Sequence, residues 1–213
     1  MELNPLTALS PIDGRYARQT DALRDIFSEC AFMNARVRVE VEWLISLSEA
    51  GFAELPHLSD HGKAFLRGLA DNFSLADCEA IKEIEKTTNH DVKAVEYWIK
   101  NQVAHDEELK SASEFVHFSC TSEDINNTSH AIMLKRGREA LADYLQQIHD
   151  TIAGFAHQWA EIPMLSRTHG QTASPTTVGK EFANVAVRLE RVIEAIRAVK
   201  IYAKMNGAVG NYN

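Results

Sequence analysis

The sequence predicts a mostly helical protein, and three observations lead to that class. The chain of 213 residues contains only five prolines and ten glycines. Stretches that lack both residues are long, and one of them runs from Leu69 to Arg136. Apolar residues recur within these stretches at the three- and four-residue spacing of amphipathic helices. Because β-rich folds need frequent turn residues, we expect an all-α fold.

The first elements follow from helical spacing and from the residues that interrupt it. Residues 1–20 are predicted to be irregular. Residues 21–50 carry apolar positions of one helix, or of a kinked pair of helices, with Gly51 as the stop signal. Residues 51–73 contain a short apolar segment between proline and glycine, which predicts a small connecting helix.

Two further helices are expected before the middle of the chain. Ser74 and Asp77 have the spacing of a capping box, which opens a helix that extends to about Lys86. A second helix has its inner face along residues 92–103. Residues 104–113 are charged and polar, and they mark a predicted domain boundary.

The boundary separates a predicted N-terminal helical domain, residues 1–112, from the first part of a central long-helix bundle, residues 113–213. In the second domain one long helix is expected from Ser122 to about Ala160. Ser174 and Pro175 have the residue types of an N-cap and a first helical position, so a second long helix is expected from there to about Gly207.

Two long helices joined by a loop form an αα-hairpin, whose apolar stripes need further helices to cover them. The chain supplies none after Asn206. We therefore expect a truncated bundle, either the N-terminal part of a longer protein or a chain that relies on partner chains.

Charge and composition limit the class of ligand. Twenty-two basic and 30 acidic residues give a net charge of −8, and 45% of the residues are hydrophobic. This charge argues against a nucleic-acid partner or an anionic membrane surface, so an anionic ligand must be bound by local groups.

The lack of a targeting signal and the spacing of the cysteines predict a soluble cytoplasmic protein. The N-terminus lacks the segments of a signal peptide, and no apolar run approaches the roughly 18 residues of a membrane helix. Cys30, Cys78 and Cys120 are widely spaced and form no C-x-x-C motif, which predicts reduced, buried thiols.

A loop histidine is the first candidate for chemistry. His169 stands beside Thr168 and Gly170 in a short connection between the two long helical patterns. An imidazole that titrates near neutral pH and has polar neighbours suits a general acid or base. The alternative is an ordinary turn, since turns also use threonine, histidine and glycine.

Arg15 and Tyr16 follow an Asp-Gly turn, and together they offer donors for phosphate or carboxylate, although the same residues suit a surface turn. Asn89, His90 and Asp91 stand at the junction of two helices. They are either a helix cap alone or a polar pocket with a tuned imidazole.

Thr121 and Asp124 have a capping signature, so the long helix should begin at about Ser122. Free N–H groups at that helix start suit a carboxylate or phosphate, and the alternative is a plain cap. His117 lies on an apolar segment and is expected to be a packed or supporting residue.

The sequence contains no motif for a metal site, a nucleotide-binding loop or a serine nucleophile. The nine histidines lack the spacing of a metal site, and no phosphate-binding glycine loop or nucleophile elbow is present. The four polar clusters on a helical scaffold suit proton transfer on an anionic substrate without a cofactor.

The same residues carry a family resemblance. Asp-Gly-Arg-Tyr at 13–16, Thr-Thr-Asn-His-Asp-Val at 87–92, His-Phe-x-x-Thr-Ser-Glu-Asp-Ile-Asn-Asn at 117–127 and Ser-Arg-Thr-His-Gly-Gln at 166–171 resemble the adenylosuccinate lyases of the fumarase/aspartase superfamily. The motifs occur in order over the whole chain, and the bacterial type is the most similar.

The resemblance implies a reversible β-elimination that releases fumarate from adenylosuccinate, to give AMP, and from SAICAR, to give AICAR, in purine biosynthesis. A base removes a proton from the succinyl carbon, and an acid protonates the departing nitrogen. No cofactor is implied. Family members are homotetramers whose sites combine residues from three subunits.

By the same resemblance His169 is the general acid, with Thr168 and Gln171 at the substrate beside it. Asn89, His90 and Asp91 also lie at the substrate. Arg15 and Tyr16 would hold the phosphate, and Thr121 and Ser122 a succinyl carboxylate. These roles are implied by the family resemblance alone.

One departure from the family pattern concerns the base. In the family it is a serine on a Ser-Ser-x-Met-Pro-x-Lys-x-Asn loop, and this sequence has no such loop. We therefore expect the chain to be inactive alone. Argininosuccinate lyase and fumarase share the scaffold and are alternative activities, and a non-catalytic scaffold like the related lens crystallins is a third possibility.

Overall fold

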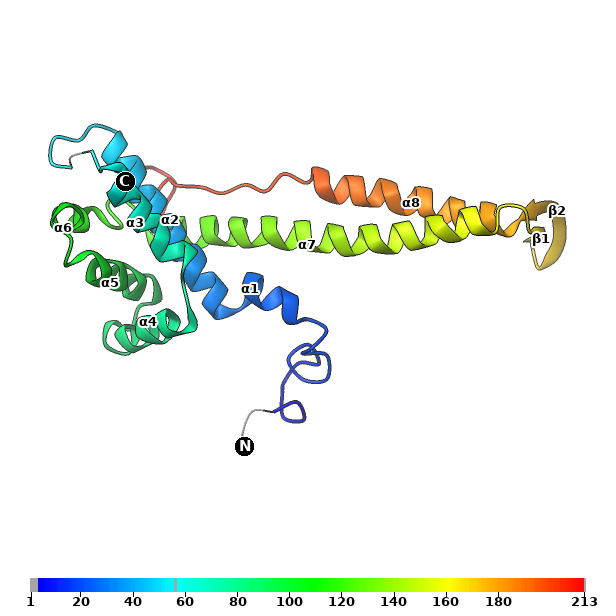
Figure 1. Cartoon of the computed structure of the whole chain (residues 1–213), viewed down its shortest axis with the longest axis horizontal. Helices are drawn as coiled ribbons and strands as arrows, with labels where there is room; N and C mark the ends of the chain where they lie inside the picture. The colour runs from blue at the N-terminus through cyan, green and yellow to red at the C-terminus, as the bar shows by residue number, and fades with distance from the viewer. Residues whose placement is uncertain (1–3, 56, 213) are drawn as a thin grey trace. The chain divides into compact units, whose positions relative to one another are not determined.

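The structure is a computed structural model that describes residues 4–55 and 57–212, and most of them are helical. The chain divides into two compact units, one formed by residues 1–134 with 202–213 and the other by residues 135–201. Figure 1 shows the elements in chain order. Their bounds are η1 Asp21–Leu23, α1 Arg24–Phe27, α2 Glu29–Glu49, α3 Asp60–Asp71, α4 Leu75–Thr88, α5 Asp91–Val103, α6 Glu107–Ala112, η2 Ser113–Phe115, α7 Ser122–Gln158, β1 Pro163–Thr168, β2 Gln171–Thr177 and α8 Val178–Ala198.

Of the two alternatives predicted for residues 21–50, one helix or a kinked pair, the structure has the pair. Ser28 has an extended backbone that separates α1 from α2, and its hydroxyl accepts a hydrogen bond from the Ala31 N–H at 3.1 Å. A serine at this position caps the second helix, which is why the kink occurs there. The helix ends just before Gly51, whose φ of 82° suits a residue without a Cβ.

The predicted capping box of α4 is also confirmed. The Ser74 N–H donates to Asp77 Oδ2 at 2.8 Å, and the Ser74 hydroxyl lies 2.7 Å from the same oxygen. The expected small connecting helix is α3. The charged stretch after α5 contains one more short helix, α6, which the sequence pattern did not indicate.

The core of the first unit forms around α2, which packs against α3, α4 and α5. Its centre consists of wholly buried aliphatic side chains, each of which contributes about 1.5–3 kcal/mol by leaving water. These side chains are Val37, Val41, Leu44, Leu66, Ile81, Val95, Ile99, Val103 and Leu109.

The prediction of reduced thiols is wrong for two of the three cysteines. Cys30 on α2 and Cys78 on α4 form a disulfide, with their Cα atoms 5.7 Å apart. Packing of the two helices brings the residues within bridging distance, although they are 48 positions apart in sequence. Cys120 is free and half-buried, and burial raises the pKa of its thiol to about 12.

The second unit consists of the later turns of α7, the hairpin β1–β2 and α8, and the two helices run side by side as the predicted αα-hairpin (Figure 1). Phe155 and Trp159 stack with ring centroids 4.8 Å apart, and Phe182 of α8 packs edge-on against both. Arg138 donates to the carbonyl oxygen of Val199. These contacts hold α8 against α7.

The connection between the two long helices is a β-hairpin, and the predicted helix start at Ser174 and Pro175 is wrong. Both residues lie in β2, and Pro175 is paired with Leu165 of β1. A two-stranded sheet consists of edge strands alone, where a missing proline N–H is tolerated. The helix begins instead at Val178, where the Thr177 hydroxyl accepts from the Lys180 N–H at 3.2 Å.

The second long helix is also shorter than predicted, because α8 ends at Ala198 and not near Gly207. The residues after it belong to the first unit from Tyr202 onward. There the Asn127 side chain accepts from the Lys204 N–H at 2.8 Å and donates to the Lys204 carbonyl at 3.0 Å. Side chains of α7 thus take the backbone hydrogen bonds that a longer α8 would have made. Among the described residues, no helix is both long and apolar enough to cross a membrane.

Candidate active site

The junction between α4 and α5 holds the predicted His90 cluster. Asn89 ends α4 in a left-handed conformation, with φ of 50°, which asparagine adopts more readily than most residues. His90 has an extended backbone and is the N-cap of α5, and its Nδ1 accepts from the Lys93 N–H at 3.2 Å. Of the two candidate caps for this helix, the structure uses His90.

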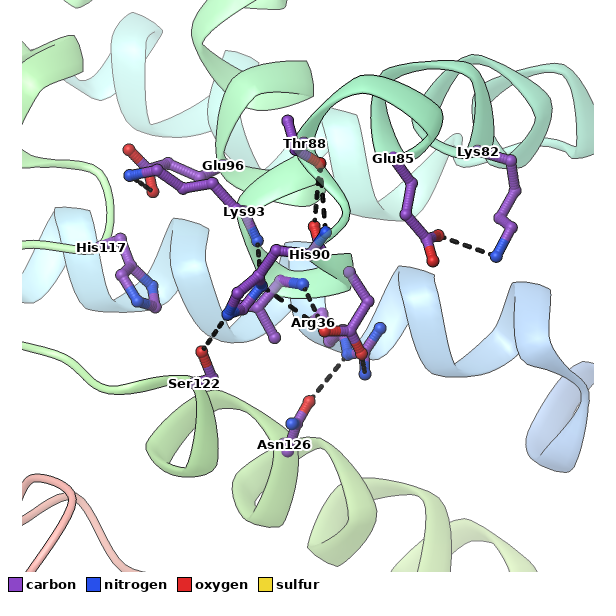
Figure 2. Close-up of polar contacts among 12 residues, drawn as sticks. Arg36, Lys82, Glu85, Thr88, His90, Lys93, Glu96, His117, Ser122 and Asn126 are labelled. Atoms are coloured by element: carbon purple, nitrogen blue, oxygen red, sulfur yellow. Dashed lines mark hydrogen bonds and ion pairs between the residues drawn. The ribbon is translucent and has the colours of Figure 1, made fainter.

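The capping bond fixes which nitrogen of His90 carries the proton in the neutral ring. Nδ1 is an acceptor, so Nε2 bears the hydrogen. The Asp91 Oδ1 lies 3.6 Å from Nδ1, which is too far for a competing hydrogen bond. Nε2 faces the Ser122 hydroxyl at 3.3 Å, so His90 presents a donor to the start of α7 (Figure 2).

Asp91 is held by a buried arginine. Arg36 Nη2 donates to Asp91 Oδ2 at 2.5 Å. Arg36 Nε donates to Asn126 Oδ1 at 2.9 Å (Figure 2). Partial burial opposes ionisation of Asp91, but the Arg36 charge and the hydrogen bonds from Val92 N–H and Arg36 outweigh it, so the pKa of Asp91 is lowered. Asp91 is therefore an ionised structural carboxylate.

The start of α7 is fixed by a second carboxylate. The helix begins at Ser122 as predicted, and Asp124 Oδ2 accepts from the Thr121 N–H at 2.9 Å. Asp124, whose side chain is 1% exposed, also pairs with Lys204 Nζ at 3.0 Å and accepts from the Asn206 N–H at 3.0 Å. Burial opposes ionisation of Asp124, but these hydrogen bonds and the Lys204 charge lower its pKa. Asp124 thus ties the segment from Lys204 to the Thr121–Ser122 turn.

The segment before Thr121 is anchored to α2. His117 Nδ1 lies 2.6 Å from Oε1 of Glu40, which is wholly buried, and the Trp43 indole N–H donates to the Phe118 carbonyl at 2.8 Å. Burial raises the pKa of Glu40, while its hydrogen bond to His117 opposes the rise only in part. Burial would lower the pKa of His117, but the Glu40 hydrogen bond and charge raise it. His117 supports the loop, as expected for a packed residue.

Arg15 and Tyr16 lie in the irregular segment before η1. The Arg15 guanidinium carbon is 5.5 Å from the centroid of the Tyr16 ring, which is 45% exposed. A Cβ at Gly14 would lie 2.8 Å from the Pro5 carbonyl oxygen, so the turn needs glycine there to pack closely. Both side chains are open to a ligand, and within residues 4–55 and 57–212 no hydrogen bond or ion pair joins them to His90.

The last predicted cluster belongs to the second unit. Thr168 and Gln171 pair with each other on either side of the hairpin turn. His169 and Gly170 form the turn, with φ of 52° and 72°. Positive φ at both central residues is typical of a tight two-residue hairpin. The His169 side chain is exposed at the tip and makes no hydrogen bond or ion pair with any residue that the structure describes. Thr168, His169 and Gln171 thus share one turn, while His90 and Ser122 belong to the first unit.

No set of three or more metal-ligating side chains gathers within residues 4–55 and 57–212. Three polar residues that support the candidate site were missed by the sequence reasoning, namely Arg36 and Asn126 beside Asp91 and Glu40 beside His117. A signal did exist, because Arg36 and Glu40 are four positions apart on the helical stripe that also contains buried Met33 and Val37. Charged residues on the inner face of a helix indicate buried polar contacts.

Comparisons with known proteins give a consistent result. A family model described as Lyase matches residues 14–213. Adenylosuccinate lyases from Vibrio cholerae, Haemophilus influenzae and Escherichia coli are 55%, 54% and 53% identical to this chain, over all of it and over 47% of their own lengths. The chain therefore spans about half the length of the curated relatives it matches.

Solved structures share the fold at lower identity. A β-carboxy-cis,cis-muconate cycloisomerase from Acinetobacter calcoaceticus aligns with a TM-score of 0.68 at 21% identity, covering 90% of this chain and 44% of that one. A fumarate lyase from Mesorhizobium aligns with a TM-score of 0.64 at 20% identity, covering 90% and 43%. At these identities the likeness concerns the fold alone.

Proposed function

The chain belongs to the Lyase family, and from that we propose that it is the N-terminal portion of an adenylosuccinate lyase. The activity is the reversible β-elimination of fumarate from adenylosuccinate, which gives AMP, and from SAICAR, which gives AICAR. The observation that carries the proposal is the contact between His90 and Ser122, at 3.3 Å, which joins two of the motifs that match the family. The 53–55% identity to adenylosuccinate lyases supports the choice of substrate.

The residues of the first unit bind the substrate in this proposal. His90 donates from Nε2 to a phosphate oxygen or to the leaving group, and Ser122 with Thr121 binds a succinyl carboxylate at the start of α7. Arg15 and Tyr16 hold the phosphate with charge and hydroxyl donors. Asn89 and Asp91 shape the pocket, and Asp91 acts through its contact with Arg36.

The residues of the second unit supply the acid. His169 protonates the departing nitrogen, and Thr168 and Gln171 orient the substrate beside it. Exposure of His169 at a hairpin tip leaves its imidazole accessible to a substrate. The general base is the serine of the family loop, which this sequence does not contain, so the chain alone is inactive in this proposal.

We also infer a cytoplasmic homotetramer in which copies of the chain complete each site. Apolar side chains along the second unit support this assembly, because Leu141, Ile148, Val185 and Val192 are each about half exposed. Their seven-residue spacing on each helix is that of a bundle seam. The division into domains of residues 1–112 and 113–213 stays a prediction.

Two protein samples test the function, the chain itself and the product of the full reading frame that encodes it. Cleavage of adenylosuccinate and of SAICAR is measured by the change in ultraviolet absorbance. We expect turnover by the full reading frame and none by the chain. Turnover of argininosuccinate or malate in place of adenylosuccinate would support the alternative lyases. Absence of all four activities would support a non-catalytic scaffold.

A further inference from the structure

One arginine contacts both elements that carry the His90 and Ser122 side chains. The Arg36 side chain is 7% exposed, and its guanidinium carbon lies 3.9 Å from the centroid of the Phe32 ring on the same helix. Its two hydrogen-bonded partners, Asp91 and Asn126, belong to α5 and α7. Arg36 therefore joins three helices through one planar group (Figure 2).

Each partner of Arg36 stands close to a residue of the proposed site. Asp91 is the neighbour of His90 and the first residue of α5. Asn126 follows Ser122 by four positions on α7, so the two side chains share a helix face. The fork of the guanidinium thus fixes the start of α5 against the start of α7, which are the two helix starts that place His90 and Ser122.

We propose that Arg36 is a positioning residue that sets the spacing between His90 and Ser122 in the substrate site. The proposal deepens the proposed function and rests on it for its kinetic consequence. Arg36 does not touch the substrate. It acts by holding the capping geometry in which His90 Nδ1 accepts from the Lys93 N–H and Nε2 faces Ser122.

A second contact, which does not involve Arg36, joins the same three helices. It should keep the fold intact when Arg36 is replaced. Val39, Val92 and Ile125 form a small buried cluster between α2, α5 and α7. Loss of Arg36 leaves this apolar contact in place, and Asp91 is exposed enough, at 45% of its side chain, to be solvated without its partner. We therefore expect variants at Arg36 to fold.

The experiment compares Arg36→Met, which removes all donors, with Arg36→Lys, which keeps the charge and loses the fork. Arg38→Met is the matched control, because Arg38 lies on the same helix and pairs with Asp71 at the surface. One readout is independent of activity, namely the ¹⁵N chemical shifts of the His90 ring in the chain. The second readout is KM and kcat for adenylosuccinate, measured on the protein product of the full reading frame.

For wild type and Arg38→Met, we expect a single His90 tautomer with hydrogen on Nε2. For Arg36→Met, we expect averaged tautomer shifts and a KM that is raised about tenfold to a hundredfold, with a smaller change in kcat. Arg36→Lys should give values between these, since one ammonium group cannot hold both partners.

A single Nε2–H tautomer retained in folded Arg36→Met overturns the proposal, and so does an unchanged KM in an active enzyme. A lower melting temperature with neither change assigns Arg36 a role in stability alone and also overturns it. If the wild-type full reading frame lacks adenylosuccinate activity, the proposed function fails, while the tautomer measurement still decides the role of Arg36.

Discussion

His90 Nε2 lies 3.3 Å from the hydroxyl oxygen of Ser122, although the two residues are 32 positions apart in sequence. The contact depends on Nδ1, which caps α5 and leaves the Nε2 hydrogen free to point toward α7. One ring thus has a structural nitrogen and a nitrogen available to a ligand, and the two roles can be separated by substitution.

His90→Asn tests that separation. Asparagine is a good N-cap, so the free energy of unfolding should change by less than about 0.5 kcal/mol. Asparagine cannot reach the position of Nε2, so kcat/KM for adenylosuccinate should fall about tenfold or more in the full reading frame, as expected for loss of a hydrogen bond to a charged ligand.

His90→Ala is the comparison for this prediction. It removes both functions, so it should lose the same activity and also about 1 kcal/mol of stability. Equal activity of the asparagine variant and wild type would show that Nε2 has no role in substrate binding.

Asp124→Asn should loosen the segment from Lys204 to Gly207. The buried carboxylate accepts from three backbone N–H groups and pairs with Lys204, and an amide cannot replace the charge. We expect a loss of about 1–3 kcal/mol in urea unfolding, because the amide offers fewer acceptor sites and leaves buried backbone N–H groups with weaker or missing hydrogen bonds. Glu123→Gln, at an exposed position in the same turn, should stay within about 0.5 kcal/mol of wild type.

The Glu40–His117 pair should make stability depend on pH. The pKa values of both groups are raised in the folded protein, so folding binds protons. The contribution of each group to the free energy of unfolding is fully present below its pKa in the unfolded chain, 4.5 for Glu40 and 6.5 for His117. It is lost as pH rises through the raised pKa of the folded protein. Glu96 and Lys93 also face the pair. The Glu96 charge raises the pKa of His117 and the Lys93 charge lowers it, each by less than the contact with Glu40.

Urea unfolding at pH values from about 6 to 9 measures this effect, since the His117 transition starts from its reference value near 6.5. The stability of wild type should fall more steeply over this range than that of the double variant Glu40→Gln with His117→Asn. His105→Gln is the control, because His105 is exposed, and it should keep the wild-type slope. A slope that is the same in the double variant contradicts the prediction.

Gly179→Ala should destabilise the second unit. A Cβ on Gly179 would lie 2.3 Å from the Ala156 carbonyl oxygen and 2.6 Å from the Ala160 backbone, so the end of α7 and the start of α8 must separate. We expect a loss of about 1–3 kcal/mol. Gly154→Ala is the matched control on α7, where no atom lies within 4 Å, and it should gain about 0.5–1 kcal/mol. Thermal unfolding that shows no difference between the two variants contradicts this prediction.

The sequence by itself determined the elements that depend on local chemistry. The capping box of Ser74 and Asp77 and the start of α7 at Ser122 both follow from side chains that bond to backbone groups three positions away. The four polar clusters were predicted for the same reason, since their residue types stand at helix starts and turns.

Only the tertiary structure decided which distant residues meet. The Cys30–Cys78 disulfide and the contact of Arg36 with Asp91 both join positions that no local spacing connects. A helix pattern specifies which face is buried but not which partner covers it, because burial of apolar surface is non-directional. For that reason the helical pattern could place Arg36 on the buried face of α2, whereas its partners Asp91 and Asn126 were decided only by the packing of α5 and α7.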